Sequence, residues 1–467
     1  MAVATAPQTI SAPGLNATGM MLDRDGDTEG ARLHYIAALA IDQDYVPALA
    51  NLGKALGDQG KLSAALAAAG RAVRLAPGET RIRNNLANLM MRANLHDAAL
   101  AELTRLTEEA PEDPVTWHNL ALLRYRMGAH AGALSHIDRA LALMPASQGM
   151  RSDRAHMLMA MGRLAEGLEA YEARWYHLAH LKPWDHHWPE WHGEDLAGKT
   201  LLFHSEQGFG DAIMLARLAP ELAARGARVT MAVPAGLVRL LAMQEWPGVE
   251  VVDLDRFDEA GPSFDYHTPM FGALRWLGYE RPEDIQSRAY VEVLTGFPLS
   301  VLPDGWRNIG LCWASGKWNM DTALRRTIPL SLFLPLASIP GVRLWSLQKG
   351  DESEGDIERF GAAGLIGDVT PHFKDWADTA ALVAQLDLVI AVDTAVAHLA
   401  GAMGKPVWML SPYTRCWRWW GIDADRSAAP CGWPWYENFR IFPQRSPGNW
   451  ASTVVWLSHE LETEMAR

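Results

Sequence analysis

Four short polar segments in the second part of this 467-residue sequence hold the residue types best suited to bind or transform a ligand. The first is EQGFGD at residues 206–211, directly after a candidate strand. Its glycines, Gly208 and Gly210, let the backbone approach a ligand closely. Asp211 stands at the start of a helix, where it could accept a proton from a hydroxyl group or simply cap the helix. With Gln207, these residues make the first candidate loop.

Two further segments supply positive charge at the ends of candidate strands. Lys317, Arg325 and Arg326 lie in a loop after the candidate strand at residues 308–314, and Lys349 follows the next strand along the chain. Cations in this place can hold or neutralise phosphate oxygens, because charge-assisted hydrogen bonds are strong. The alternative is an exposed basic loop with no ligand. The sequence predicts a phosphate site without deciding among these cations.

The fourth segment, DTAVAHLAGAMGKPVW, begins at Asp393 after a buried apolar run. Thr394 and Ala395 open a helix, and the free N–H groups of a helix N-terminus bind anions. Thr394 could both cap that helix and bind a phosphate oxygen. His398 lies about one turn further along on the same side. It is either a ligand-binding or a structural histidine.

Alternating strands and helices must bring these segments together. The candidate strands are short apolar runs, typical of buried parallel strands, with helical stretches between them. They fall at residues 200–205, 228–234, 249–255, 264–270, 308–314, 342–348, 364–369, 386–392 and 406–412. Two successive Rossmann-like halves predict a cleft between two lobes, and ligands of such sheets lie at the carboxyl ends of the strands. The four polar segments should therefore meet in that cleft.

Prolines at Pro77, Pro111 and Pro145 recur every 34 residues in the first third of the chain, which is the period of the tetratricopeptide repeat. Small residues recur in phase with them, as the close packing of paired helices requires. The pattern predicts about five helix–turn–helix units over residues 12–175, with a generic alanine-rich bundle as the alternative. Such arrays usually bind a peptide or protein partner, although a structural or dimerising role is also open.

The overall composition argues against several classes of protein. The formal charge is −13, from 42 Lys and Arg against 55 Asp and Glu, which argues against a nucleic-acid partner. The first residues lack the pattern of a secretory signal, and the most apolar segment, 386–410, contains charges that a membrane span would leave unpaired. Three scattered cysteines fit a reducing compartment. We therefore expect a cytoplasmic protein without a membrane span.

The histidine and aspartate patterns do not predict a metal site. The segment at residues 174–199 reads as an irregular linker, and its histidines lack both cysteine partners and a fixed helical spacing. These histidines are His177, His180, His186 and His187. Asp253 and Asp255 form a D-x-D tripeptide. This pattern is too short to indicate a metal site, and we interpret it as a turn.

An aromatic run near the end of the second lobe has two interpretations. Large aromatic side chains can stack on a sugar or a base, but more often they pack a core. The run consists of Trp417, Trp419, Trp420, Trp433, Trp435 and Tyr436.

Taken together, six segments of the sequence resemble those of bacterial tetratricopeptide-repeat glycosyltransferases. These segments are EQGFGD, RRTIPL, SLQKG, DTAALVAQLDLVIAVDTAVAHLAGAMGKPVW, WRWW and GNW. The catalytic region of that family has the GT-B fold. It is related to the heptosyltransferases of lipopolysaccharide synthesis and, more distantly, to the O-linked N-acetylglucosamine transferases. The resemblance implies an inverting transfer from a nucleotide sugar that serves as co-substrate, with no metal and no other cofactor.

The resemblance also assigns roles to individual residues. Asp211 corresponds to the catalytic base of the heptosyltransferases, and their phosphate-binding cation corresponds to either Lys317 or Arg326. Their donor-binding Asp-Ser/Thr-Gly-x-x-His segment begins at Asp393 here and ends at His398. Ala395 replaces the usual glycine of that segment.

The expected fold class is α plus α/β, with a tetratricopeptide α-solenoid followed by a GT-B pair of Rossmann-like domains. The expected parts are the repeats at 12–175, an aromatic linker at 176–198, an acceptor-side lobe at 199–304, a donor-side lobe at 305–450 and a C-terminal helix at 451–467. In proteins of this fold class the last helix commonly crosses back to the first lobe.

Three functional hypotheses follow. The leading hypothesis is a protein O-glycosyltransferase whose repeats recruit a polypeptide and whose cleft modifies Ser or Thr. Flagellin is the named candidate acceptor, because one branch of repeat-containing transferases modifies it with nonulosonic acids. The second hypothesis is a transferase for a lipid-linked or polysaccharide acceptor, and the third is a non-catalytic interaction scaffold. Whether the repeats also form a homodimer contact is left open.

Overall fold

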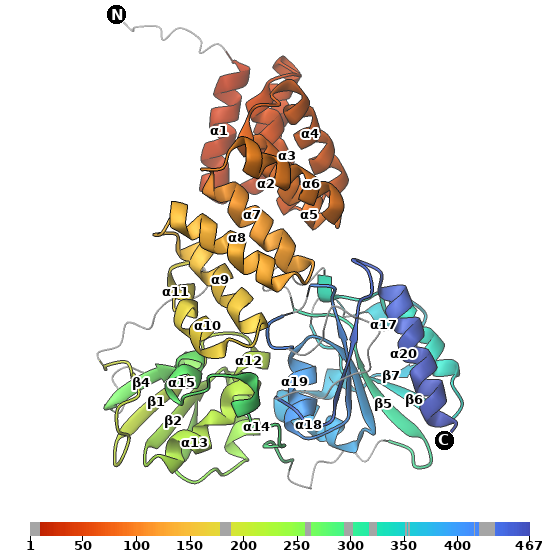
Figure 1. Ribbon diagram of the computed structural model, residues 1–467. Coiled ribbons are helices and arrows are strands. Elements are labelled where there is room, and N and C mark those ends of the chain that lie inside the picture. Colours follow the sequence, from red (N-terminus) through yellow and green to blue (C-terminus); the bar gives the residue numbers. More distant parts are fainter. Residues whose placement is uncertain are drawn as a thin grey trace, which may run out of the picture. The chain divides into compact units, whose positions relative to one another are not determined.

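The computed structural model describes residues 10–177, 188–256, 263–293, 302–316, 325–350, 353, 355–414, 416–419 and 435–467. It divides into two compact units, Met1–Met150 and Arg151–Arg467. The first unit is helical and the second contains parallel sheets covered by helices (Figure 1). This confirms the predicted α plus α/β fold class.

Paired helices with a strict repeat make up the first unit. The helices are α1 (Ala12–Arg24), α2 (Thr28–Ile41), α3 (Val46–Asp58), α4 (Leu62–Leu75), α5 (Thr80–Arg92), α6 (His96–Glu109), α7 (Pro114–Arg126) and α8 (His130–Leu143). The first helices of successive pairs begin at residues 12, 46, 80 and 114, and the second helices at 28, 62, 96 and 130. Both series advance by 34 residues, as the proline spacing predicts.

Alanine at one repeated position lets the two helices of each pair approach each other. Ala31, Ala65, Ala99 and Ala133 recur every 34 residues and are all fully buried. In the second pair, a Cβ on Gly53 would lie 3.3 Å from the backbone oxygen of Ala65. Larger side chains at these positions would force the helices apart, because interiors are close-packed.

Buried polar side chains link neighbouring repeats. The Asn84 amide donates to Asp113 Oδ2 at 3.0 Å and to Thr116 Oγ1 at 2.8 Å. Its oxygen accepts from the Asn119 amide at 2.9 Å. Asn84 is 3% exposed, so these contacts satisfy an amide that water does not reach.

Replacing Asn84 with alanine should destabilise the helical unit, because Asn119 and Thr116 lose their buried partner. We expect the free energy of unfolding to fall by about 1–3 kcal/mol. Urea denaturation of the full chain followed by far-UV circular dichroism would measure this. Asn88→Ala, at a half-buried position outside this hydrogen-bond network, is the matched control. Equal unfolding midpoints for both variants would contradict the assignment.

The last helical pair groups with the second unit rather than with the repeats. Helix α10 (Leu164–Tyr171) follows α9 (Gln148–Ala160), and α11 (Arg174–His177) comes next. The backbone N–H groups of Leu164 and Ala165 both donate to the Glu280 carbonyl, and Leu168 lies in the core of the first lobe. Compactness therefore divides the chain near residue 150, earlier than the expected boundary at 175.

A parallel sheet with the order β3-β2-β1-β4 forms the first lobe. Its strands are β1 (Thr200–His204), β2 (Arg228–Val233), β3 (Val249–Asp253) and β4 (Tyr266–Pro269). Helices α12 (Phe209–Ala216), α13 (Leu218–Ala224), α14 (Ala235–Ala242) and α15 (Met270–Trp276) accompany them. Asp253 ends β3 and its carboxylate accepts from the Asp255 N–H at 3.0 Å, so this D-x-D is a turn.

The second lobe has a parallel sheet with the order β10-β9-β8-β5-β6-β7. Its strands are β5 (Arg307–Cys312), β6 (Val342–Ser346), β7 (Ile366–Gly367), β8 (Leu388–Val392), β9 (Val407–Ser411) and β10 (Phe439–Pro443). Its helices are α17 (Asp356–Arg359), α18 (Trp376–Gln385), α19 (Ala395–Ala402) and α20 (Trp450–Met465). The sequence reading missed β10, which pairs with β9.

The last helix, α20, packs on the second sheet. Its Leu457 and Leu461 lie in one core cluster with Ile309 of β5, and Glu464 forms an ion pair with Arg307 at 2.6 Å. The expectation that this helix returns to the first lobe is therefore wrong. The apolar face of α20 is instead buried against the strands of the second sheet.

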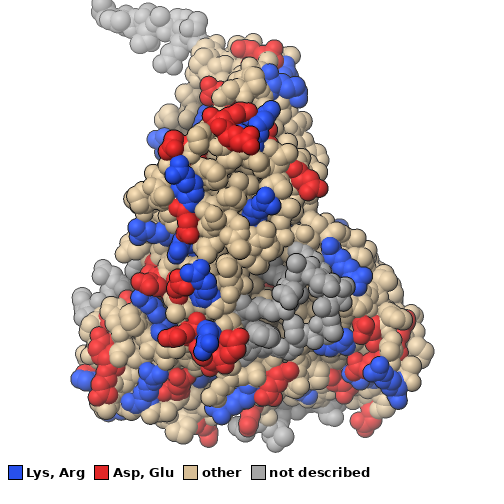
Figure 2. Space-filling model, in the orientation of Figure 1, with Lys and Arg blue, Asp and Glu red and all other residues tan. Residues whose placement is uncertain are grey.

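Charge is distributed without a dominant basic surface on the visible face. Figure 2 shows Lys and Arg interspersed with Asp and Glu over the described residues of that face. Within the described part of the chain, no helix has the length and apolar character needed to span a membrane.

Candidate functional site

A cavity of about 990 Å³ lies in the second unit at the carboxyl ends of strands from both lobes. Sites for small molecules have this size and position. Of the residues singled out from the sequence, it is lined by Gln207, Gly208, Gly210, Asp211, Arg326, Lys349, Asp393, Thr394, Ala395 and His398. Arg325 is not among its lining residues, and Lys317 lies outside the described residues.

Helices α12 and α19 lie side by side (Figure 1), and the first residues of both helices line the cavity. A Cβ on Gly210 would lie 2.9 Å from His398 Cδ2 and 3.4 Å from Ala395 Cα. A larger residue at position 210 would therefore displace the His398 ring. Because helix N-termini carry unpaired N–H groups and partial positive charge, the junction favours an anion.

Asp211 forms an ion pair instead of capping its helix. The residue at the N-cap of α12 is Gly208, and Asp211 Oδ1 lies 2.5 Å from Arg418 Nη2. Arg418 Nη1 also donates to Cys416 Sγ at 2.9 Å, and its guanidinium lies over the Trp417 ring. The Arg418 side chain is 12% exposed and orients the carboxylate toward the cavity.

Sequence reasoning missed Arg418. It lies within the WRWW string, where only the tryptophans drew attention. The sequence signal that could have identified Arg418 as a site residue is its position as a cation inside an aromatic run near a predicted cleft.

A second arginine–carboxylate pair lies at the N-terminus of α19. Arg326 Nη2 is 2.9 Å from Asp393 Oδ2, and Nη1 donates to the Asp393 carbonyl at 3.3 Å. Thr394 is the N-cap residue, but its side chain makes no capping hydrogen bond. Its hydroxyl at the cavity wall is thus available to a ligand.

His398 is buried at the inner end of the cavity. Its Nδ1 lies 2.8 Å from Tyr436 Oη, and its ring stacks on Trp419 with centroids 5.3 Å apart. Burial lowers the pKa of His398 to about 4, although Asp393 and Asp211 oppose this shift. The imidazole is therefore neutral at physiological pH.

The loops after β5 and β6 are fixed to each other by Gln348. Its Oε1 accepts from the backbone N–H groups of Trp313 and Ala314 at 3.0 and 2.8 Å. The neighbouring Lys349 donates to the Phe373 carbonyl at 2.5 Å. Lys349 therefore holds the loop before α18, while its ammonium remains at the cavity wall.

The described part of the aromatic run packs the interior. Trp417, Trp419, Trp435 and Tyr436 are all buried, whereas Trp420 and Trp433 lie outside the described residues. This favours core packing over stacking on a ligand for those that can be placed.

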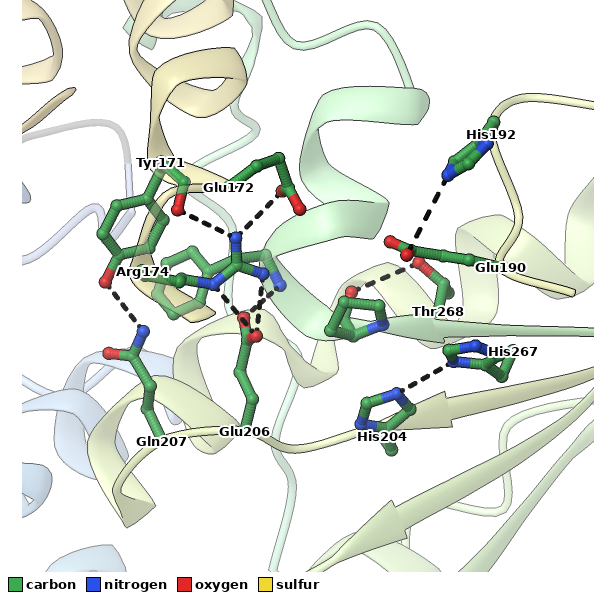
Figure 3. Close-up of polar contacts among 12 residues, drawn as sticks. Tyr171, Glu172, Arg174, Glu190, His192, His204, Glu206, Gln207, His267 and Thr268 are labelled. Carbon is green, nitrogen blue, oxygen red and sulfur yellow. Dashed lines mark hydrogen bonds and ion pairs between the residues drawn. The ribbon is translucent and has the colours of Figure 1, made fainter. Parts of the chain in front are cut away.

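A buried ion pair holds the EQGFGD loop against the helical segment that precedes the first lobe (Figure 3). Arg174 donates to Glu206 Oε2 through Nε at 3.1 Å and through Nη2 at 2.8 Å, and the two side chains are 0% and 2% exposed. Arg174 also contacts Glu172 at 2.9 Å. Next to this pair, the Gln207 amide donates to Tyr171 Oη at 2.8 Å. Burial raises the pKa of Glu206, and Arg174 opposes this shift.

No cluster of three or more metal-binding side chains occurs among the residues that the structure describes. Of the linker histidines, His180, His186 and His187 lie outside the described residues, as does the side chain of His177. His204 and His267 meet within the first lobe at 3.3 Å.

Comparisons with known proteins agree with the two-part organisation. Residues 56–123 match a tetratricopeptide-repeat family, and residues 375–426 match glycosyltransferase family 9 (heptosyltransferase). Protein FlbA of Caulobacter vibrioides is 30% identical over 334 residues, which are 65% of this chain and 53% of that protein. The chain thus spans about half the length of this curated relative.

Two similar solved structures each cover about a third of the chain. A thermophilic tetratricopeptide-repeat protein of Thermus thermophilus is 20% identical and covers 36% of this chain and 92% of that one, with a TM-score of 0.34. MamA of Desulfovibrio magneticus is 17% identical and covers 35% and 90%, with a TM-score of 0.29. Similarity at this level carries no argument about function. The family matches therefore support tetratricopeptide repeats in the first unit and a region in the second unit that is similar to glycosyltransferase family 9.

Replacing Arg174 with methionine should leave Glu206 as a buried acid without its ion-pair partner. Breaking a buried pair in this way costs about 3–5 kcal/mol of folding free energy. Removing the cation raises the pKa of Glu206 further, so the carboxyl can stay protonated at low pH. The loss of stability should therefore be larger at pH 8 than at pH 5.

Urea unfolding followed by tryptophan fluorescence at both pH values would measure this. Arg163→Met, which breaks an exposed pair with Glu166, is the control. A loss of stability that does not change with pH would show that the Glu206 charge is not its cause.

Proposed function

We propose that this chain, which joins tetratricopeptide repeats to a glycosyltransferase family 9 region, transfers a sugar from a nucleotide sugar to an acceptor hydroxyl. The observation that carries the proposal is the cavity lined by the first residues of both α12 and α19. It places a carboxylate from the first lobe opposite a cation and a helix N-terminus from the second lobe. Glycosyl transfer needs a base on one side and stabilisation of a departing phosphate on the other.

The second lobe supplies the donor side of the reaction. Arg326, the Thr394 hydroxyl and the N–H groups of α19 converge at one wall of the cavity. These groups can hold the phosphate of a nucleotide sugar and stabilise its charge as the glycosidic C–O bond breaks. Since they provide the positive charge themselves, we propose a metal-independent reaction.

The first lobe supplies the base. In the proposed step, the acceptor oxygen attacks the anomeric carbon from the face opposite the leaving phosphate, and its proton passes to an Asp211 oxygen. The phosphate leaves with the bonding electron pair, so the configuration at the anomeric carbon inverts. Arg418 holds one carboxylate oxygen at 2.5 Å and leaves the other to face the acceptor.

We further propose that the acceptor is Ser or Thr of a protein held by the repeats. Tetratricopeptide arrays generally bind polypeptides along a continuous surface. Flagellin is the acceptor we would test first, because the sequence resembles the repeat-containing transferases that modify it.

Nucleotide sugars that bind the cavity should raise the melting temperature by mass action. A panel of CMP, UDP, GDP and ADP sugars should give a shift with one nucleotide class, of about 2.7 kcal/mol in stability at a hundredfold excess over Kd. Arg326→Gln should abolish the shift. Arg343→Gln removes an exposed cation of the same lobe outside the cavity and should leave the shift unchanged. A panel without any shift would contradict the proposed donor site.

Asp211→Asn should lower the transfer rate by about 10²–10⁴-fold while the donor still binds, because the amide cannot take the proton. The assay is the gain of one sugar mass on flagellin, with the donor that the panel identifies. Wild-type activity retained by Asp211→Asn would exclude Asp211 as the base. No mass gain with the wild-type chain would remove flagellin as the acceptor and leave the donor result standing.

A further inference from the structure

The two lobes also meet at the start of α18, in addition to the contact between α12 and α19. Helices α14 and α18 lie side by side there (Figure 1). The rings of Phe209 and Trp376, one from each lobe, lie 5.5 Å apart between centroids. A Cβ on Gly236 would lie 3.4 Å from Trp376 Cδ1, so the lobes pack closely at this point. All three residues line the cavity.

Arg239 of α14 binds two acids at the start of α18. Its Nε and Nη2 donate to Asp375 Oδ2 and Oδ1 at 2.7 and 2.6 Å, which is the bidentate geometry of a strong charge-assisted pair. Nη2 also forms an ion pair with Asp378, whose side chain is 4% exposed. Arg239 itself is not among the residues that line the cavity. Its effect on a ligand in the cavity must therefore pass through the residues that it holds.

The peptide group between Phe373 and Lys374 is fixed from two sides. Its N–H, which belongs to Lys374, donates to Asp378 Oδ2 at 2.7 Å. Its carbonyl, which belongs to Phe373, accepts from Lys349 Nζ at 2.5 Å. Asp378 is also the buried acid that Arg239 binds. This part of the cavity wall is therefore held by the first lobe through Asp378 and by the loop after β6 through Lys349.

The Lys374 side chain remains available to a ligand. Lys374 lines the cavity and is exposed. Three other cations of the cavity wall are already engaged, since Arg326 and Arg418 each pair with an aspartate and Lys349 donates to a carbonyl. Among the described residues, Lys374 has no ion pair or side-chain hydrogen bond. Its ammonium can bind an anionic oxygen without giving up an existing contact.

We propose that Lys374 binds a phosphate oxygen of the donor nucleotide, and that Arg239 is the positioning residue that holds Lys374 in place from the other lobe. The identity of the ligand rests on the proposed function, whereas the positioning role of Arg239 does not. An ammonium group suits a phosphate, which it binds as a point charge. The donor site is then complete only while α14 and α18 stay in contact.

The positioning role of Arg239 is tested without a ligand by hydrogen exchange of the backbone amides, measured by mass spectrometry. Arg239→Gln should speed exchange in a peptide that covers residues 372–380, because Asp378 loses its ion pair and holds the Lys374 N–H less firmly. Arg239→Lys keeps the charge but cannot form the bidentate pair, so its effect should be smaller.

Two controls separate this effect from general destabilisation. Arg228→Gln removes an exposed cation of the first lobe outside the cavity, and it should leave exchange unchanged. Peptides from the buried strand β8 should exchange at the wild-type rate in every variant. Unchanged exchange at residues 372–380 in Arg239→Gln, or exchange that rises equally in β8, would overturn the positioning role.

The phosphate contact is tested with the nucleotide sugar that the panel identifies. Lys374→Gln should weaken its binding roughly tenfold, the effect of one charge-assisted hydrogen bond. The affinity of the wild-type chain should also fall more steeply with added salt than that of Lys374→Gln, because the contact joins two charges. Arg343→Gln, the exposed control of the same lobe, should behave as the wild type does. Wild-type affinity in Lys374→Gln, or an unchanged salt response, would overturn the phosphate contact.

A double variant tests whether Arg239 acts through Lys374. Arg239→Gln should weaken the nucleotide sugar several-fold in the wild-type chain, roughly as much as one lost charged contact, and add nothing in Lys374→Gln. Additive losses would show that Arg239 acts by another route. If no member of the panel binds, the proposed function and the phosphate contact both fail, and hydrogen exchange still decides the positioning role.

Discussion

The close approach of α12 and α19 at Gly210 is the constraint on which the cavity depends. It brings Asp211, one turn into the first helix, to the same space as Thr394 and His398 of the second. Any side chain at residue 210 would lie too close to the His398 ring. A glycine that reads in the sequence as a flexible loop residue is thus a steric requirement for two lobes to share one site.

Ion pairs across the cleft add to this constraint. Asp211 of the first lobe pairs with Arg418 of the second, and Arg239 of α14 pairs with Asp375 at the start of α18 at 2.6 Å. Within the second lobe, Asp393 neutralises Arg326. A phosphate entering the cavity would compete with Asp393 for that arginine. In the proposed donor site, phosphate binding would therefore be coupled to the position of the α19 N-terminus.

Periodic features of the fold could be predicted from the sequence. The repeats have a fixed period because every unit buries the same small side chains, and most strands are continuous apolar runs. Strand β10 was missed because it follows an aromatic run instead of a helix. The prediction for α20 failed because it came from resemblance, whereas in the structure Leu457 packs in the core of the second lobe.

The site was predictable only where strand ends place polar residues. Asp211, Asp393 and His398 follow strands or open helices, so topology alone predicts that they meet. Their partners could not be found this way, because Arg418 and Tyr436 come from a segment without recognisable periodicity.

The Arg174–Glu206 pair connects the helices before the first lobe to the loop that lines the cavity. Both side chains are withdrawn from water, so separating them would leave two uncompensated charges in the interior. The loop that carries Asp211 therefore cannot move independently of helices α10 and α11. Tyr171 adds a second link through Gln207, directly beside the cavity wall. Helix α10 continues the repeat period, yet its contacts make it part of the first lobe. This explains why the boundary from compactness differs from the boundary from periodicity.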